Sequence, residues 1–111
     1  MAPFHIVIAA FCCGFGVQLA LAAHGTSHVV VRQIKRNFDR SEVSLNVGEI
    51  IRFTNEDEFL HQIYVESKDF SFDSDEKGPG EELDVEFPVP GHFTVRCGIH
   101  PRMGLDVSVE K

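Results

Sequence analysis

The sequence predicts an all-β protein, a single-domain β-sandwich, and three observations support this fold class. From residue 28 onward, short β-type runs alternate with turn signals, and no stretch has a sustained helical period. Residues 43–47, 83–87 and 105–109 alternate apolar and polar side chains, so that each run presents one apolar face. The chain of 111 residues has room for one domain with one hydrophobic core.

The expected strands are spaced as in a sandwich and are separated by turn-forming residues. Turns are expected at Asn46–Glu49, Lys77–Gly80 and Pro88–Gly91. Ten phenylalanines and no tryptophan predict a phenylalanine-rich core, and 67–80 is expected to be an irregular loop or one helical turn. The expected strands are 28–34, 43–47, 49–54, 62–66, 82–87, 92–97 and 105–110.

The first 23 residues differ from the rest of the chain because they contain no Asp, Glu, Lys or Arg. An apolar stretch that ends in small residues predicts a signal peptide over residues 1–23, cleaved after Ala22 or Ala23. The mature domain would then be 24–111, in the periplasm or exported elsewhere. An uncleaved membrane anchor or a buried helix is the alternative, since no Lys or Arg precedes a stretch of about 18 residues.

The number and positions of the cysteines predict one thiol that is bound to a ligand. Cys12 and Cys13 fall inside the expected signal peptide, so the mature chain would keep only Cys97 and could form no internal disulfide. A lone thiol in an oxidising compartment is open to oxidation unless something binds it. A metal ion would do so.

The net charge of −7 lies entirely beyond residue 23. This charge argues against nucleic acid and against an anionic membrane surface as partners of the mature form, and it favours basic or mixed-charge proteins. Acidic residues gather between Glu66 and Glu86, whereas basic residues gather between Arg32 and Arg40. The acidic stretch is either a docking face or simply a solvated surface.

A group of candidate metal ligands lies near the carboxyl end. Cys97, His100 and Met103 follow one another at intervals of three residues between two expected strands, and His61 stands at the start of another. Singly, a His or a Met is more often structural than a ligand. Together they form the ligand set of a type 1 copper site, with two His and one Cys in a plane and a weak axial Met. Methionine is a poor zinc ligand, so copper is favoured over zinc.

Each ligand has an expected role in such a site. The Cys97 thiolate supplies the strong bond and the colour, His61 and His100 complete the plane, and Met103 tunes the reduction potential. His100, in the loop, is expected at the solvent edge, where electrons would pass. The apolar residues expected to form a docking surface around it are Phe59, Ile99 and Pro101.

The loop and the upstream histidine resemble the cupredoxins, and their spacing is similar to that of amicyanins rather than plastocyanins or pseudoazurins. In amicyanin-type loops two residues separate Cys from His and two separate His from Met, with a proline after the His, as in 97–103. The segment Phe53–Asn55, ahead of His61, is also similar. The resemblance covers about residues 28–110 and implies a cupredoxin-like Greek-key β-sandwich that binds one type 1 copper ion.

Two positions depart from the cupredoxin pattern. Gln62 stands where these families commonly have asparagine, so the hydrogen bond between the ligand loops is expected to change. Ile99 replaces the commoner proline before the loop histidine. The reduction potential and the identity of the partner are therefore left open.

The resulting hypothesis is an exported, monomeric one-electron carrier that is not an enzyme and that serves a redox protein such as a dehydrogenase, cytochrome or oxidase. A protein that stores or delivers copper is the alternative, and an interaction module with a vestigial site is a third interpretation. Only Cys97 is available in the loop, which excludes a binuclear copper centre, and a phytocyanin would need a disulfide. If cleavage exposes His24 as the amino terminus, its amine and imidazole could chelate a second copper ion; a solvated tail is the other interpretation.

Overall fold

The computed structural model describes residue 14 and residues 28–111. Apart from Gly14, the expected signal peptide, its cleavage site and His24 lie outside the described residues. Within the described part, no helix is long and apolar enough to cross a membrane.

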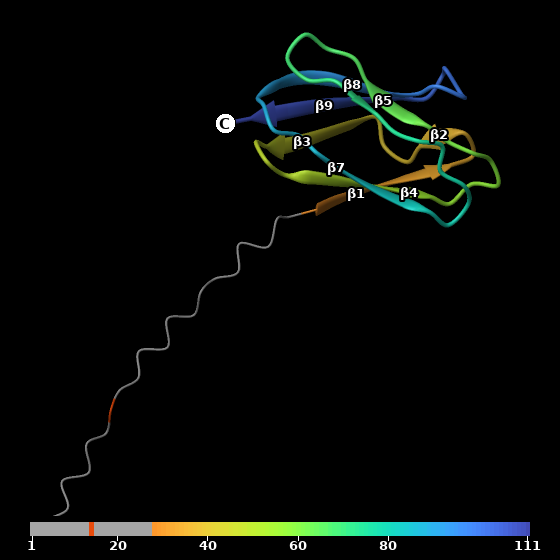
Figure 1. Ribbon diagram of the computed structural model, residues 1–111, viewed down its shortest axis with the longest axis horizontal. Coiled ribbons are helices and arrows are strands. Elements are labelled where there is room, and N and C mark those ends of the chain that lie inside the picture. Colours follow the sequence, from red (N-terminus) through yellow and green to blue (C-terminus); the bar gives the residue numbers. More distant parts are fainter. Residues whose placement is uncertain (1–13, 15–27) are drawn as a thin grey trace, which may run out of the picture.

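Within residues 28–111, nine strands form the two layers of a β-sandwich, which confirms the predicted all-β fold (Figure 1). The strands are β1 (His28–Ile34), β2 (Asn37–Phe38), β3 (Glu42–Asn46), β4 (Ile50–Asn55), β5 (Ile63–Val65), β6 (Phe72–Asp73), β7 (Glu82–Glu86), β8 (Gly91–Cys97) and β9 (Gly104–Glu110). One sheet has the order β2-β1-β4-β7 and the other has the order β3-β9-β8-β5-β6. Both sheets are mixed, because β1 runs parallel to β4 and β3 runs parallel to β9.

The core lies between the two sheets and is rich in phenylalanine, as predicted. In β8 and β9 every second side chain is buried, which is the alternation of a strand with one face on the core. The rings of Phe70, Phe87 and Phe93 pack on one another with centroids 5.3 to 6.1 Å apart. Such aromatic contacts add to the large apolar area that each ring removes from water.

Seven of the strands correspond to the expected ones, and their ends differ by at most one residue. β2 and β6 were not expected, because two-residue strands are too short to show an alternating pattern. The expectation of an irregular loop or helical turn over 67–80 is wrong in part. The segment contains β6, and Lys77 forms a bridge with His61.

Candidate metal centre

The pairing of β5 with β8 brings Cys97 next to the His61 segment. Cys97 is the last residue of β8 and pairs with Ile63. Just beyond that pair, the backbone N–H of Gln62 donates to the Cys97 Sγ at 3.4 Å, and the N–H of Gly98 donates to the Gln62 carbonyl at 2.9 Å. The register of the sheet thus brings together, at one end of the sandwich, side chains that are far apart in the sequence.

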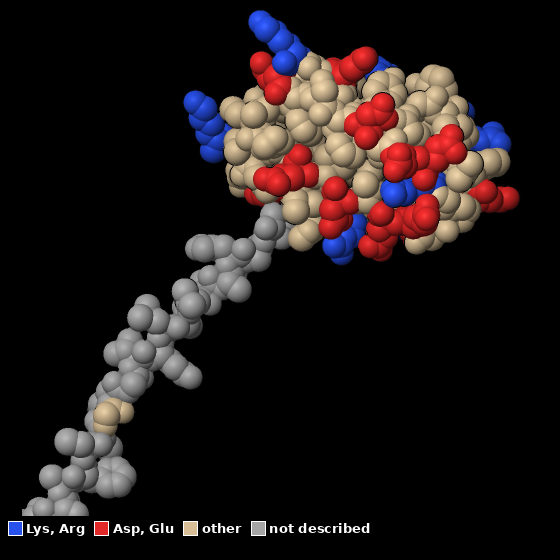
Figure 2. Space-filling model, in the orientation of Figure 1, with Lys and Arg blue, Asp and Glu red and all other residues tan. Residues whose placement is uncertain are grey.

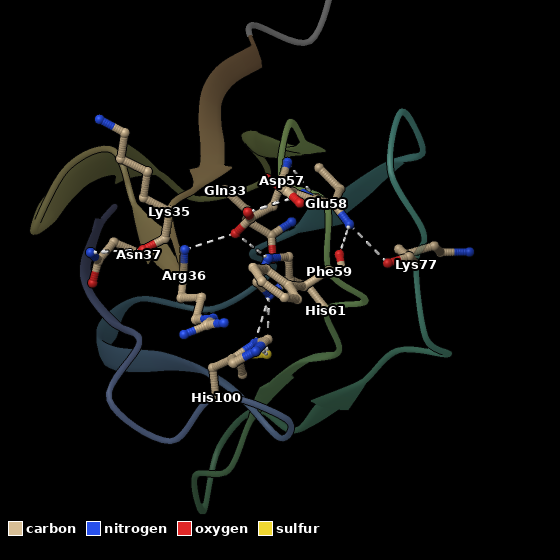
Figure 3. A network of polar contacts seen from close by, with 12 residues as sticks. Gln33, Lys35, Arg36, Asn37, Asp57, Glu58, Phe59, His61, Lys77 and His100 are labelled. Atoms are coloured by element: carbon tan, nitrogen blue, oxygen red, sulfur yellow. Dashed lines mark hydrogen bonds and ion pairs between the residues drawn. The ribbon is translucent and has the colours of Figure 1, made fainter.

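His61 is held by its backbone on both sides and is 1% exposed. Its N–H donates to the Lys77 carbonyl at 3.0 Å, and its carbonyl accepts from the Lys77 N–H at 2.8 Å. The buried Asn55 side chain donates to the carbonyls of Phe59 and Lys77 at 2.8 and 3.0 Å. The segment between β4 and β5 is therefore a fixed platform for the imidazole (Figure 3).

His100 lies in the loop between β8 and β9 and is half-buried. The backbone N–H of Met103 donates to the His100 carbonyl at 3.0 Å, which closes a tight turn. The ring of His100 meets the exposed Phe59 ring edge-on, with centroids 5.9 Å apart. This imidazole is thus the ligand candidate that reaches the molecular surface.

Three of the four predicted ligands converge on one point. The Cys97 Sγ lies 3.6 Å from the His61 Nδ1 and 3.9 Å from the His100 Nδ1, and the two Nδ1 atoms are 3.2 Å apart. From these distances, a point equidistant from the three atoms lies about 2.1 Å from each. Metal–nitrogen bonds in proteins measure about 2.0–2.1 Å and metal–sulfur bonds about 2.3 Å. The cluster therefore fits a single metal ion.

A buried carboxylate orients the first imidazole. Asp57 lies on the far side of His61 from His100, and the His61 Nε2–H donates to the Asp57 Oδ2 at 3.0 Å (Figure 3). This contact leaves the lone pair of Nδ1 free to face Cys97 and His100. A carboxylate behind a ligating histidine fixes the ring and makes it a stronger donor.

The environment shifts the pKa values of Asp57 and His100. Burial by itself would raise the pKa of Asp57, but hydrogen bonds from the Arg36 N–H, His61 and the Glu58 N–H outweigh burial and leave the pKa below its usual value. The pKa of His100 is lowered by burial first and then by the charges of His61 and Arg36. Neutral imidazole at His100 is the form that can bind a metal.

The fourth predicted ligand, Met103, lies in the same loop and is 1% exposed. Burial of its thioether in the core under the loop is compatible with an axial position, and its role as a ligand stays a prediction. Gln62, the first departure from the cupredoxin pattern, donates from its side chain to Asp73 and to the Ser74 carbonyl. It therefore ties the His61 segment to β6, and its backbone N–H reaches the cysteine sulfur.

The sequence pattern does not mark Asp57 as a residue that supports the site, and it marks Asn55 only as part of the segment Phe53–Asn55. Both are polar residues in a turn-like segment, where exposed side chains are the rule. An acid four residues before a candidate histidine was the available signal, but only the folded structure shows that it is buried against the ring.

Comparisons with known proteins agree with this architecture. No protein-family model matches the sequence, and no curated protein matches it. Among solved structures, a copper-containing nitrite reductase from Thermus scotoductus SA-01 is similar over 77% of this chain, with 26% identity and a TM-score of 0.70. The chain spans only 23% of that protein.

Amicyanin structures resemble the chain over most of their own length. Amicyanin from Paracoccus versutus is 23% identical, with a TM-score of 0.69, and the match covers 76% of this chain and 82% of that one. A reduced tryptophan-to-tyrosine mutant of amicyanin is 20% identical at the same TM-score, with 75% and 82% covered. The chain therefore has the β-sandwich fold of the cupredoxins, and it carries at one end the His–Cys–His cluster typical of them.

Proposed function

We propose that this protein is a type 1 copper protein that carries single electrons between redox partners. His61, Cys97 and His100 would hold the ion, with Met103 as the axial ligand. The observation that carries this proposal is the convergence of two imidazole nitrogens and one thiolate around a point about 2.1 Å from each. Two His and one Cys in a plane are the donor set of blue-copper electron-transfer sites.

Copper in such a site supplies a one-electron redox couple, and the residues of the chain supply rigidity. The donor atoms sit on β8, on a segment bridged to Lys77 and on a short closed turn. Because these supports are hydrogen-bonded, the donors need not move when the charge of the site changes. The N–H of Gln62 lies against the Cys97 Sγ, where it can stabilise thiolate charge.

Copper storage or delivery is the competing function, and burial weighs against it. Cys97 and His61 are each 1% exposed, so an acceptor protein could approach the site only past the half-buried His100. Ligand exchange needs open access to several donors, whereas electron transfer needs one exposed edge.

Addition of Cu(II) to the purified metal-free protein tests the proposal. An intense blue thiolate-to-copper absorption band should appear and should vanish in Cys97→Ser. In protein that retains residues 1–23, the matched control Cys12→Ser/Cys13→Ser should keep the band. Met103→Leu should stay blue with a raised reduction potential, because loss of a weak axial donor favours Cu(I). A colourless wild-type protein would contradict the type 1 site.

Repeated redox cycling separates the carrier from a delivery protein. The copper-loaded protein would be reduced and reoxidised many times in the presence of a strong Cu(I) chelator. A carrier recovers its full blue band at each reoxidation, whereas a delivery protein loses copper to the chelator within the first few reductions.

We also propose that the protein works after export, as a monomer, and with a protein redox partner. The charge-free segment of residues 1–23 supports export. Mass spectrometry of the protein from an exported fraction should find an amino terminus at Ala23 or His24. A full-length mass in the membrane fraction would favour the anchor instead.

A further inference from the structure

The surface around His100 combines an apolar centre with positive charge. Phe59 and Ile99 are 37% and 39% exposed, and Pro101 is exposed beside them. A hollow of about 300 Å³ opens here, and its lining residues are Arg36, Ile99, His100, Pro101 and Arg102. Among the described residues, this lining contains two arginines and no carboxylate. We call these five residues together with Phe59 the His100 surface.

Arg36 is held on this surface by its backbone. Lys35 and Arg36 form the turn between β1 and β2, and both have left-handed φ angles, 52° and 58°. Non-glycine residues are strained in this region, and such strain gathers at functional sites. The strained turn lets the Arg36 N–H donate to the Asp57 Oδ2 at 2.7 Å. The same turn aims its guanidinium over the ring of Phe59, 4.1 Å from the centroid.

Arg36 and Arg102 line the same hollow as His100, so both positive charges lie beside its ring. Several nearby acids have partners of their own. Glu56 is paired with Arg32, the Asp57 carboxylate is buried behind His61, and Asp39, which lines a pocket with Arg102, accepts from the Arg32 backbone N–H at 3.0 Å. Glu58, next to Phe59, is an exposed acid that adjoins this surface.

Most of the negative charge lies elsewhere. Exposed carboxylates gather over the face formed by β1, β4 and β7 (Figure 2). There Glu82, Asp84 and Glu86 project outward from β7, and Asp84 pairs with Arg52 at 2.8 Å. The net charge of the chain and the charge at the electron-transfer edge therefore have opposite signs.

We propose that the His100 surface docks a redox protein that carries carboxylates around its own electron-transfer site. This inference rests on the proposed function and names the chemistry of the partner. It reverses the expectation drawn from the net charge, which favoured a basic or mixed-charge partner. Complementary charge at the contact steers encounter and fixes orientation, while apolar residues at the centre give close contact.

Anion binding to the metal-free protein tests the surface independently of copper. The probe is hexacyanochromate(III), a redox-inert paramagnetic trianion that broadens the NMR signals of nearby amides. Broadening should concentrate on Arg36, Phe59 and residues 98–102. It should fall at least threefold in Arg36→Gln/Arg102→Gln and rise in Glu58→Gln. Broadening that is spread evenly, or centred on Arg52 or Arg96, would overturn the proposal.

Lys111→Gln is the matched control, because it removes one positive charge at the far end of β9. Seven residues of strand, about 23 Å, separate that end from Met103. The local signal should be unchanged in this variant. A loss of about half that of the double arginine variant, which removes two charges, would show that only net charge matters and would contradict the inference.

Electron transfer to hexacyanoferrate(III) adds a kinetic readout in the copper-loaded protein. One electron passes from the reduced protein to the complex, which becomes hexacyanoferrate(II). At low salt the double arginine variant should react about tenfold more slowly than the wild type. Above about 0.5 M salt the rates should converge, because the Debye length is then only a few ångström. Reduction potentials measured for each variant correct for driving force.

The outcomes separate the two proposals. A colourless protein that still shows the local anion signal would contradict the copper function and leave the basic surface standing. A blue, redox-active protein whose rate with the anion is the same in all variants would overturn the docking inference alone.

Discussion

The two histidines of the candidate centre occupy opposite environments. His61 is 1% exposed, is bridged to Lys77 through its backbone and is bound through Nε2 to a buried carboxylate. His100 is half-buried, sits in a short loop and meets Phe59 at the surface. The His61 imidazole is therefore held rigidly inside the sandwich, whereas the His100 imidazole lies at its surface. An electron carrier needs both, because the first keeps the geometry constant and the second lets an electron leave.

The largest expected effect of this difference is on stability. His61→Ala in the metal-free protein should lower the free energy of unfolding by about 3 kcal/mol, because it opens a buried cavity and removes one of the hydrogen bonds to the buried Asp57 carboxylate. His100→Ala should cost about 1 kcal/mol or less, since water can replace the ring. Urea denaturation of both variants measures the contrast. Equal losses would show that the two environments are not energetically distinct.

The second largest expected effect is on the reduction potential, when the buried charge of Asp57 is removed. The carboxylate of Asp57 lies one imidazole away from the proposed ion and favours its more positive, oxidised state. At roughly 6 Å and an effective dielectric constant near 20, the interaction is about 2–3 kcal/mol, or about 100 mV. Asp57→Asn should therefore raise the potential by about that amount in voltammetry.

Glu58→Gln is the matched control for the buried charge, because it removes an exposed carboxylate in the neighbouring position. Solvent screening should limit its effect to about 20 mV. If the two variants shift the potential equally, burial of Asp57 has no special role at the site.

The half-buried histidine, His100, should produce a pH dependence near neutrality. Burial and neighbouring positive charge lower the pKa of His100 in the folded state, so protonation favours the unfolded chain. Stability of the metal-free protein should be complete above about pH 6.5 and should decline as the pH falls below that value. His100→Gln should flatten the decline between pH 7 and pH 5 in urea titrations. An unchanged slope would contradict the assigned shift.

The pH range below about 4 reports on the Asp57 carboxylate, which accepts a hydrogen bond from His61. Asp57 has a lowered pKa in the folded state, so its contribution is present above its unfolded pKa of about 3.9 and is lost as the pH falls through the folded value. Asp57→Asn should make the acid limb of the stability curve shallower. Asp84→Asn, at an exposed paired carboxylate, is the comparison for a surface contribution.

Much of the candidate metal centre could be predicted from the sequence, because the sequence patterns that indicate it are local. The intervals between Cys97, His100 and Met103 are short, and an alternating apolar pattern marks the strands on either side. The convergence of His61 on the same point depends on the register of β5 and β8, which local patterns do not define. Asp57 and the short β2 and β6 strands were missed for the same reason, since their roles exist only in the assembled fold.

The smallest expected effect concerns the strained turn of Lys35 and Arg36, which places Arg36 on the His100 surface. Lys35 has a φ of 52°, which asparagine tolerates better than lysine. Lys35→Asn should therefore stabilise the protein by about 0.5 kcal/mol, because it relieves part of the strain and keeps the neighbouring Arg36 in place. Lys68→Asn, at an exposed lysine without a positive φ, should give no gain. Thermal denaturation of both variants measures the difference. If Lys35→Asn destabilises the protein, contacts of the lysine side chain must stabilise the turn. The energetic cost of the positive φ angles would then be offset by these contacts.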